Sequence, residues 1–186
     1  EIARAMKICI VGLPNLAVLA PEFRQYPVGG EAVQHTLLAR ALARRGHDVS
    51  MVVGDYGQPD GVIYSGVKTL TAYSPEAGVP ILRFIYPRWV KLWNALARAH
   101  AQVYYVSCAG MELGLVAMFC RRHRRGVIFR TASDTDCDPR NLSIRYWRDR
   151  RLYEYGLRRA DAILVQSEFQ GGLMRRNYGL DSLPAR

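Results

Sequence analysis

Two adjacent glycines, Gly29 and Gly30, stand directly before a segment with the apolar spacing of a helix. Glycine lets a ligand approach the backbone closely, and the first turn of a helix presents N–H groups with partial positive charge. A phosphate group suits such a place. The same pair also fits a flexible turning loop, and the pair by itself leaves both interpretations open.

A second candidate for chemistry is the segment at residues 131–138, which reads TASDTDCD and holds three carboxylates within five positions. Ser133, Asp134 and Asp136 could bind the hydroxyls of a sugar or hold a reacting group. Asp and Ser residues also build turns by accepting bonds from nearby backbone N–H groups. Both interpretations of this segment stay open.

Several other chemistries are disfavoured. Gly12-Leu13-Pro14-Asn15 follows the first expected strand in place of a dinucleotide fingerprint, although Asp55 ends the second strand where a ribose-binding acid would stand. The spacing of the four cysteines matches no metal or redox pattern, so we expect no metal and no cofactor. The four histidines fall on helices or their ends, and we expect His47 to cap the first helix.

The chain is strongly basic. Its 186 residues carry a formal net charge of +10, and 49% of them are hydrophobic, which excludes disorder as the main state and favours anionic partners. Arg88, Lys91 and Arg98 flank Trp89 and Trp93, and this combination suits an anionic membrane surface or an ordinary solvated face. We expect no nucleic-acid partner, because no known binding motif is present.

Strand and helix patterns alternate along the chain. Strands are expected at residues 7–11, 49–53, 67–73, 81–86, 103–106, 127–129 and 162–165, and helices at 31–45, 88–100, 111–122, 143–159 and from a Ser167 cap to about 178. In the first helix the expected apolar stripe is Val33, Leu37, Leu38, Ala41 and Leu42. No further strand is expected at the end of the chain.

This alternation predicts an α/β fold: a Rossmann-like, doubly wound, mainly parallel sheet with helices on both faces. Ligands of such sheets bind at the carboxyl ends of the strands. The loop from Tyr26 to Glu31, Asp55 and the 131–138 segment are expected at that edge.

Two segments resemble the N-terminal domain of family 4 glycosyltransferases, which are retaining enzymes of the GT-B architecture. Gly29-Gly30 is followed at residues 38–49 by LARALARRGHDV, and residues 159–168 read RADAILVQSE. In the family the first pattern reads roughly L-A-x-x-L-x-x-R-G-H-x-V, and the second is commonly A-D followed after several residues by Ser. The resemblance covers the chain from Met6 to Gly179.

The resemblance implies that this domain binds the acceptor and that Gly29 and Gly30 contact the diphosphate of a nucleotide-sugar donor, without a metal. Ser133 and Asp134 occupy the place where many members have a histidine, so they are the candidate catalytic residues. Asp136, Tyr26 and Glu31 are candidate acceptor contacts, although Glu31 also suits the start of a helix as an acid.

The domain expected from this resemblance covers residues 6–186, with residues 1–5 upstream of a Met6-Lys7 start. The C-terminal donor-binding domain is expected outside this chain, so the chain alone should not turn over substrate. We expect the enzyme in the cytoplasm, acting on the inner face of a membrane. Two alternatives stay open: a stand-alone binder of a phosphorylated ligand, and a binder of anionic membranes without catalysis.

Overall fold

The computed structural model describes residues 4–74, 76–78 and 84–185. The chain forms two compact units, Glu1–Val103 and Tyr104–Arg186, called unit 1 and unit 2 below. In both units, strands and helices alternate and neighbouring strands run mainly parallel, so the predicted Rossmann-like α/β fold is confirmed.

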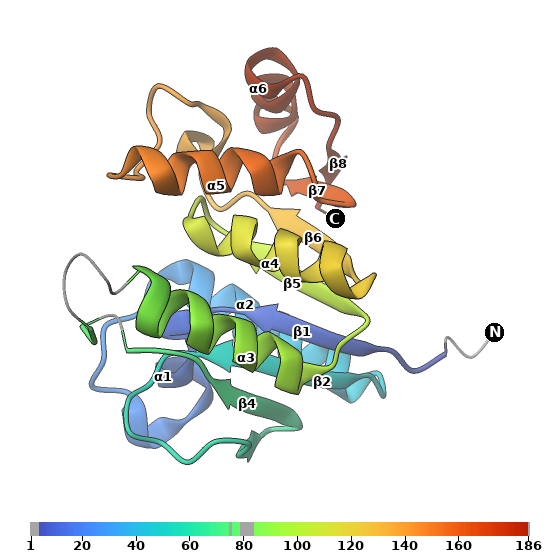
Figure 1. Ribbon diagram of the computed structural model, residues 1–186. Coiled ribbons are helices and arrows are strands. Elements are labelled where there is room, and N and C mark those ends of the chain that lie inside the picture. The colour runs from blue at the N-terminus through green and yellow to red at the C-terminus, as the bar shows by residue number, and fades with distance from the viewer. Residues whose placement is uncertain (1–3, 75, 79–83, 186) are drawn as a thin grey trace. The chain divides into compact units, whose positions relative to one another are not determined.

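Unit 1 carries strands in the order β3-β4-β2-β1 (Figure 1). Its elements are β1 (Lys7–Val11), the 3-10 turn η1 (Leu13–Asn15), α1 (Leu16–Leu19), the 3-10 turn η2 (Pro21–Phe23), α2 (Gly30–Arg44), β2 (Asp48–Val53), β3 (Ile63–Tyr64), β4 (Val67–Thr71), the irregular segment η3 (Phe84–Trp89) and α3 (Val90–Ala99).

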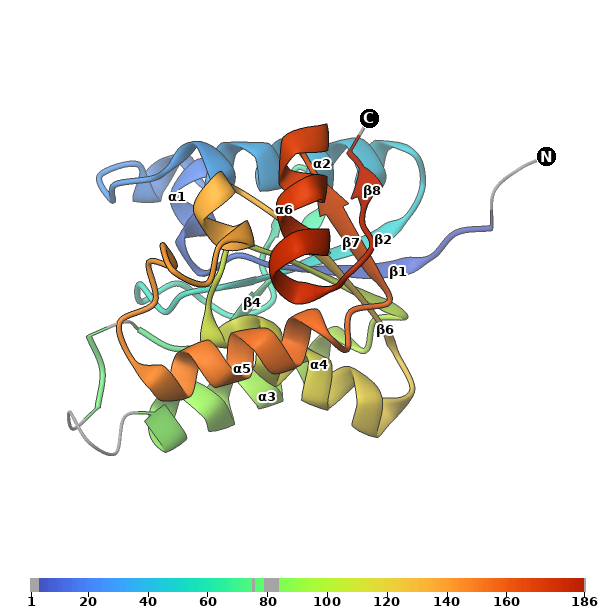
Figure 2. The same cartoon turned by 90° about the horizontal axis from the view of Figure 1, so that it is seen from above.

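The centre of unit 1 is a buried parallel ladder. Ile8 of β1 stands opposite Val49 of β2, and Val49 stands opposite Val67 of β4, while β3 pairs antiparallel with β4. Figure 2 shows α2 and α3 on opposite sides of these strands. Strands covered on both faces must be apolar throughout, which explains the β-branched runs in the sequence.

The predicted burial of α2 is wrong. Val33 and Leu37 are exposed, Leu37 to 59%, and the other members of the expected stripe are half-buried. The buried side of the helix has smaller or polar side chains: Ala32, His35, Thr36 and Ala39. These four positions follow the spacing of one helix face.

Two further predictions in unit 1 need correction. The strand expected at 81–86 has residues 81–83 outside the described part, and Phe84–Trp89 is helical except for Tyr86, whose φ of −131° and ψ of 125° are extended. In α3 the expected apolar side was Val90, Trp93, Leu96 and Ala97. Leu96 is buried as predicted, but the other buried residues are Leu92 and Ala95.

Unit 2 carries strands in the order β5-β6-β7-β8, with β6, β7 and β8 parallel. Its elements are β5, which starts at the last residue of unit 1 (Val103–Ser107), α4 (Met111–His123), β6 (Gly126–Arg130), the 3-10 turn η4 (Asp134–Cys137), α5 (Trp147–Leu157), β7 (Ala162–Val165), α6 (Glu168–Tyr178) and β8 (Leu183–Pro184). Figure 2 shows α4 and α5 on one side of these strands and α6 on the other.

The C-terminal half of unit 2 differs from the prediction in two places. A short strand, β8, pairs with β7, so Leu183 lies opposite Leu164 where no strand was expected. The helix expected from residue 143 begins at Trp147 instead. The guanidinium of Arg150 donates to the carbonyl oxygens of Ile144 and Leu142, which holds the preceding segment outside the helix.

None of the helices in the described part of the chain is long and apolar enough to cross a lipid bilayer.

Candidate functional site

The Gly29-Gly30 pair lies open at the start of α2. Gly29 is the residue before the helix, with φ −89° and ψ 166°, and Gly30 is its first residue. Both are exposed, and a Cβ atom added to either would meet nothing within 4 Å. Neither residue needs a positive φ, so the backbone does not require glycine here. What the pair provides is free space beside the first turn of a 15-residue helix.

The loop before α2 is attached to the carboxyl ends of the strands of unit 1. The ring of Tyr26 lies 4.6 Å, between centroids, from the ring of Tyr56, which follows β2. The N–H of Gly54 donates to the carbonyl oxygen of Leu13, 2.8 Å away, so the ends of β1 and β2 are joined directly. Burial, with a smaller contribution from nearby Tyr26, raises the pKa of Tyr56. The edge predicted for ligand binding therefore includes Tyr26.

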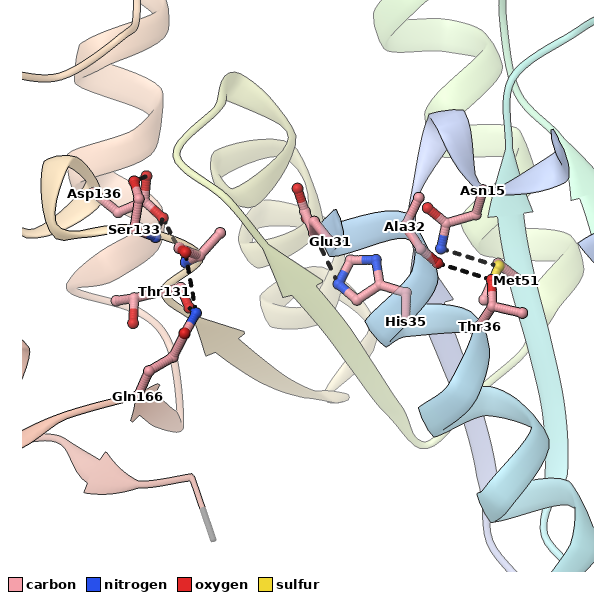
Figure 3. A network of polar contacts seen from close by, with 11 residues as sticks. Asn15, Glu31, Ala32, His35, Thr36, Met51, Thr131, Ser133, Asp136 and Gln166 are labelled. Carbon is pink, nitrogen blue, oxygen red and sulfur yellow. Dashed lines mark hydrogen bonds and ion pairs between the residues drawn. The ribbon is translucent and has the colours of Figure 1, made fainter. Parts of the chain in front are cut away.

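Glu31 is directed along its own helix. Its Oε1 atom lies 3.6 Å from Nε2 of His35 one turn later, and Figure 3 shows the two side chains facing each other. The His35 side chain is 1% exposed, whereas that of Glu31 is 28% exposed. His35 lies on a helix, as predicted for all four histidines. What distinguishes His35 in the sequence is that Glu31 precedes it by four residues, a spacing that brings the two side chains together on a helix.

A buried asparagine supports the same end of β1. The amide of Asn15 donates to Sδ of Met51 over 3.4 Å (Figure 3). A Cβ atom at Gly12 would lie 2.6 Å from this amide group, so the glycine makes room for Asn15.

The three cations predicted to face a membrane have partners inside unit 1. Lys91 lies 3.6 Å from Asp55, which sits after β2. The guanidinium of Arg98 lies 3.2 Å from Asp60 and donates to a backbone carbonyl. The guanidinium of Arg88 lies 5.9 Å from the centroid of a tyrosine ring. The membrane role of these three residues stays a prediction. The charges of Lys91 and Arg98 are paired with carboxylates of unit 1.

In unit 2, Asp136 holds the predicted acidic turn together. The residue is 5% exposed, and its Oδ2 accepts from the N–H groups of Ala132 at 2.7 Å and Ser133 at 3.3 Å. The hydroxyl of Tyr153 donates to the Asp136 carbonyl oxygen. The Asp136 carboxylate is therefore occupied within the turn, where it faces Ser133 (Figure 3).

Asp134 and Ser133 lie on the outside of the same turn, and both are exposed. The Oδ1 atom of Asp134 accepts from the amide of Gln170 at 2.9 Å. The Ser133 hydroxyl lies 2.6 Å from the hydroxyl oxygen of Thr135. These two predicted catalytic residues are thus neighbours on one exposed surface of unit 2.

Two glutamines of the α6 region, which were not among the predicted site residues, form hydrogen bonds with this turn. Gln170, buried on α6, accepts from the hydroxyl of Thr131 at 2.7 Å and from the N–H of Gln166. The amide of Gln166 donates to the carbonyl oxygens of Thr131 and Ala132 (Figure 3). The sequence signal for Gln170 was its position three residues after the predicted cap Ser167. The Ser167 hydroxyl accepts from the Gln170 N–H, which confirms the predicted cap.

The buried groups near the turn are kept neutral. Burial, with smaller contributions from the carboxylates of Asp136 and Asp134, raises the pKa of Cys137 to about 12. Burial is also the main cause of the raised pKa of Tyr153. The anionic groups of the turn are therefore its carboxylates. Among the described residues, no cluster of His, Cys, Asp or Glu has the arrangement of a metal site.

A family model matches most of the chain. The family model described as a glycosyl transferase 4-like domain matches residues 29–186, which begins at the glycine pair and includes the acidic turn. A search of curated proteins found no match. Because the family model covers most of the chain, the chain belongs to the glycosyl transferase 4-like domain family and has a glycosyltransferase-related function.

Proposed function

We propose that this domain takes part in moving a sugar from a nucleotide-sugar donor to a polysaccharide, glycolipid or other sugar acceptor with retention of anomeric configuration. The proposal is supported by family membership together with one structural observation. That observation is the open, exposed Gly29-Gly30 start of α2.

The chemistry places its main electrostatic demand on the leaving group. The bond between the anomeric carbon and the diphosphate oxygen breaks, and an acceptor hydroxyl oxygen forms the new bond while losing its proton. Negative charge therefore grows on the departing diphosphate. The positive end of a helix stabilises an anion by about 0.3–1 kcal/mol at an exposed site and by up to about 2 kcal/mol in a partly buried one.

Glycine at positions 29 and 30 suits this role because nothing blocks the approach of a diphosphate to the first turn of α2. Tyr26 and Glu31 flank the pair, and in this proposal they contact the acceptor. The acceptor role of Glu31 competes with its ion pair to His35.

The exposed surface of the acidic turn supplies hydrogen bonds to sugar hydroxyls. One oxygen of Asp134 accepts from Gln170, and its exposed carboxylate keeps further capacity to accept from a hydroxyl or to take up its proton. Ser133 adds a hydroxyl beside it. Asp136 takes a supporting role, because its carboxylate is buried and bonded to the turn.

The test is the substitution Gly30→Val in the protein that carries this chain. The added methyl groups fill the space beside the first turn of α2, so the affinity for the nucleotide-sugar donor and the rate of transfer should fall about tenfold or more, a change of about 1.4 kcal/mol. Donor affinity is measured by calorimetry and turnover by release of the nucleoside diphosphate. The thermal midpoint should stay unchanged, since the new side chain meets no neighbour.

Gly172→Val on α6 is the matched control, because a Cβ atom there also meets nothing within 4 Å. It should leave donor affinity unchanged. Wild-type donor affinity in Gly30→Val would contradict the phosphate role of the pair. Diphosphate binding without any sugar transfer would instead support a ligand-binding domain.

A further inference from the structure

The start of α5 presents aromatic rings and arginines to solvent. This α5 patch consists of Arg140, Arg145, Tyr146, Trp147, Arg148 and Arg151. Trp147 is 75% exposed and Tyr146 is 46% exposed, although tryptophan is usually well covered in a folded domain. The indole ring at the first residue of α5 is therefore available to a partner.

The arginines around these rings carry an excess of positive charge. The guanidinium of Arg145 lies 5.5 Å, and that of Arg148 5.9 Å, from the centroid of the Tyr146 ring. Arg151 follows Trp147 by one helical turn, so the two lie on the same side of α5.

Acidic side chains offset only part of this charge. Residues 138–154 contain three acids and five arginines, and Asp149 lies 2.9 Å from Arg148. Among the described residues, neither Arg145 nor Arg151 has an ion-pair partner. The patch therefore differs from Lys91 and Arg98, whose charges are balanced by Asp55 and Asp60.

We propose that the α5 patch binds the surface of an anionic lipid membrane. Trp and Tyr rings are stable at the level of the lipid headgroups, where one end of each ring is apolar and the other is wet. Arginine side chains beside them bind headgroup phosphates, and each basic residue near an anionic leaflet adds to the affinity. The highly exposed ring of Trp147 can insert among lipid headgroups, which rearrange around it. This inference stands apart from the proposed sugar transfer, because it uses only charge and exposure in unit 2.

The experiment measures co-sedimentation of the chain with phosphatidylcholine vesicles that contain or lack phosphatidylglycerol. Binding is expected only to the anionic vesicles and should weaken as salt rises. The double substitution Arg145→Glu and Arg151→Glu should lower the partition coefficient at least about tenfold, and Trp147→Ala about fivefold. Anionic vesicles should also shift the tryptophan emission to the blue, and this shift should be lost in Trp147→Phe.

Two matched controls separate this patch from general basicity. Arg121→Glu with Arg122→Glu makes the same change of charge at the exposed end of α4, and Phe169→Ala removes another aromatic ring, 61% exposed, on α6. Both controls should bind vesicles within about twofold of the wild type if the patch is the contact surface.

Four results would overturn the proposal. The first two are absence of binding to anionic vesicles and an equal loss of binding in the control variants. The third is release of the chain from vesicles by single-stranded DNA at a concentration below that of the accessible lipid. The fourth is dimerisation of the chain that is lost in Trp147→Ala. The DNA result would assign the patch to nucleic acid, and the dimer result to a second copy.

Discussion

Two carboxylates of one turn have different roles because their burial differs. Asp136 is 5% exposed and accepts two backbone N–H groups, whereas Asp134 is exposed and accepts one bond from the side chain of Gln170. A buried N–H that loses its acceptor cannot turn to water, so the loss is costly. Asp136 holds two such N–H groups, whereas Asp134 accepts a single bond, from the amide of the buried Gln170. The turn thus contains a buried structural acid next to an exposed one, whose contact with a substrate hydroxyl stays a prediction.

At this scale we predict that Asp136→Ala lowers the free energy of unfolding by about 1–3 kcal/mol, because the N–H groups of Ala132 and Ser133 lose their acceptor. Asp134→Ala should cost less, about 0.5–1.5 kcal/mol, since only one bond, that from the amide of Gln170, is lost. Urea unfolding followed by circular dichroism measures both. Equal destabilisation by the two variants would show that Asp136 does not hold the turn. In the full protein, Asp134→Ala should be the variant that loses transfer activity.

At the scale of elements, α4 and α5 are held together by two glycines. A Cβ atom at Gly114 would collide with the carbonyl oxygen of Leu152, and one at Gly156 would lie 2.5 Å from Cγ of Leu113 and 2.8 Å from its backbone carbon. Glycine lowers helix stability when it stands alone, so its presence inside both helices has a packing reason. The close approach positions α5, which carries Tyr153 beneath the acidic turn and Trp147 at its exposed end.

We predict that Gly156→Ala destabilises the protein by about 1–3 kcal/mol through overpacking, even though alanine is the better helix former. Gly172→Ala on α6 is the control. Its Cβ meets open space, so it should leave stability unchanged or raise it by up to about 1 kcal/mol. Thermal unfolding by calorimetry measures both variants. A stabilised Gly156→Ala would mean that α4 and α5 are not in tight contact at this point.

At the scale of the whole molecule, both units bury groups that stay protonated. Burial raises the pKa of Cys9 in unit 1 to about 12, and the pKa of Cys137 in unit 2 to about 12. Burial also raises the pKa of Tyr178. The folded chain therefore keeps protons that the unfolded chain releases once the pH exceeds the ordinary thiol value of 9.0.

The sign of the pH dependence follows from this difference. Between pH 9 and 12 the unfolded state binds fewer protons at these thiols, so their contribution to stability should be constant well below pH 9 and fall above it. Each of the two cysteines contributes up to about 1.4 kcal/mol per pH unit. Urea unfolding under reducing conditions at pH 8, 9 and 10 measures the slope. A Cys9→Ala and Cys137→Ala double variant should show a shallower decline, and an identical slope in both proteins would contradict the assignment.

Local sequence was enough for the order of elements. Apolar β-branched runs and the Ser167 cap depend on near neighbours. These local patterns predicted the Rossmann-like alternation and the helix that follows the glycine pair. The family of the chain follows from the same local patterns. The use of Gly29, Gly30, Ser133 and Asp134 in sugar transfer stays a prediction.

Tertiary packing decided what depends on partners distant in sequence. In the packed chain Val33 and Leu37 face solvent, and β8 pairs with β7. The Asp136 carboxylate accepts from the N–H groups of Ala132 and Ser133. Packing also balanced Lys91 against Asp55 while leaving Trp147 exposed. Periodicity shows that a helix has two faces and that a loop has carboxylates. Only the packed chain determines which face is covered and which carboxylate still meets water, because burial depends on neighbours that the local sequence does not specify.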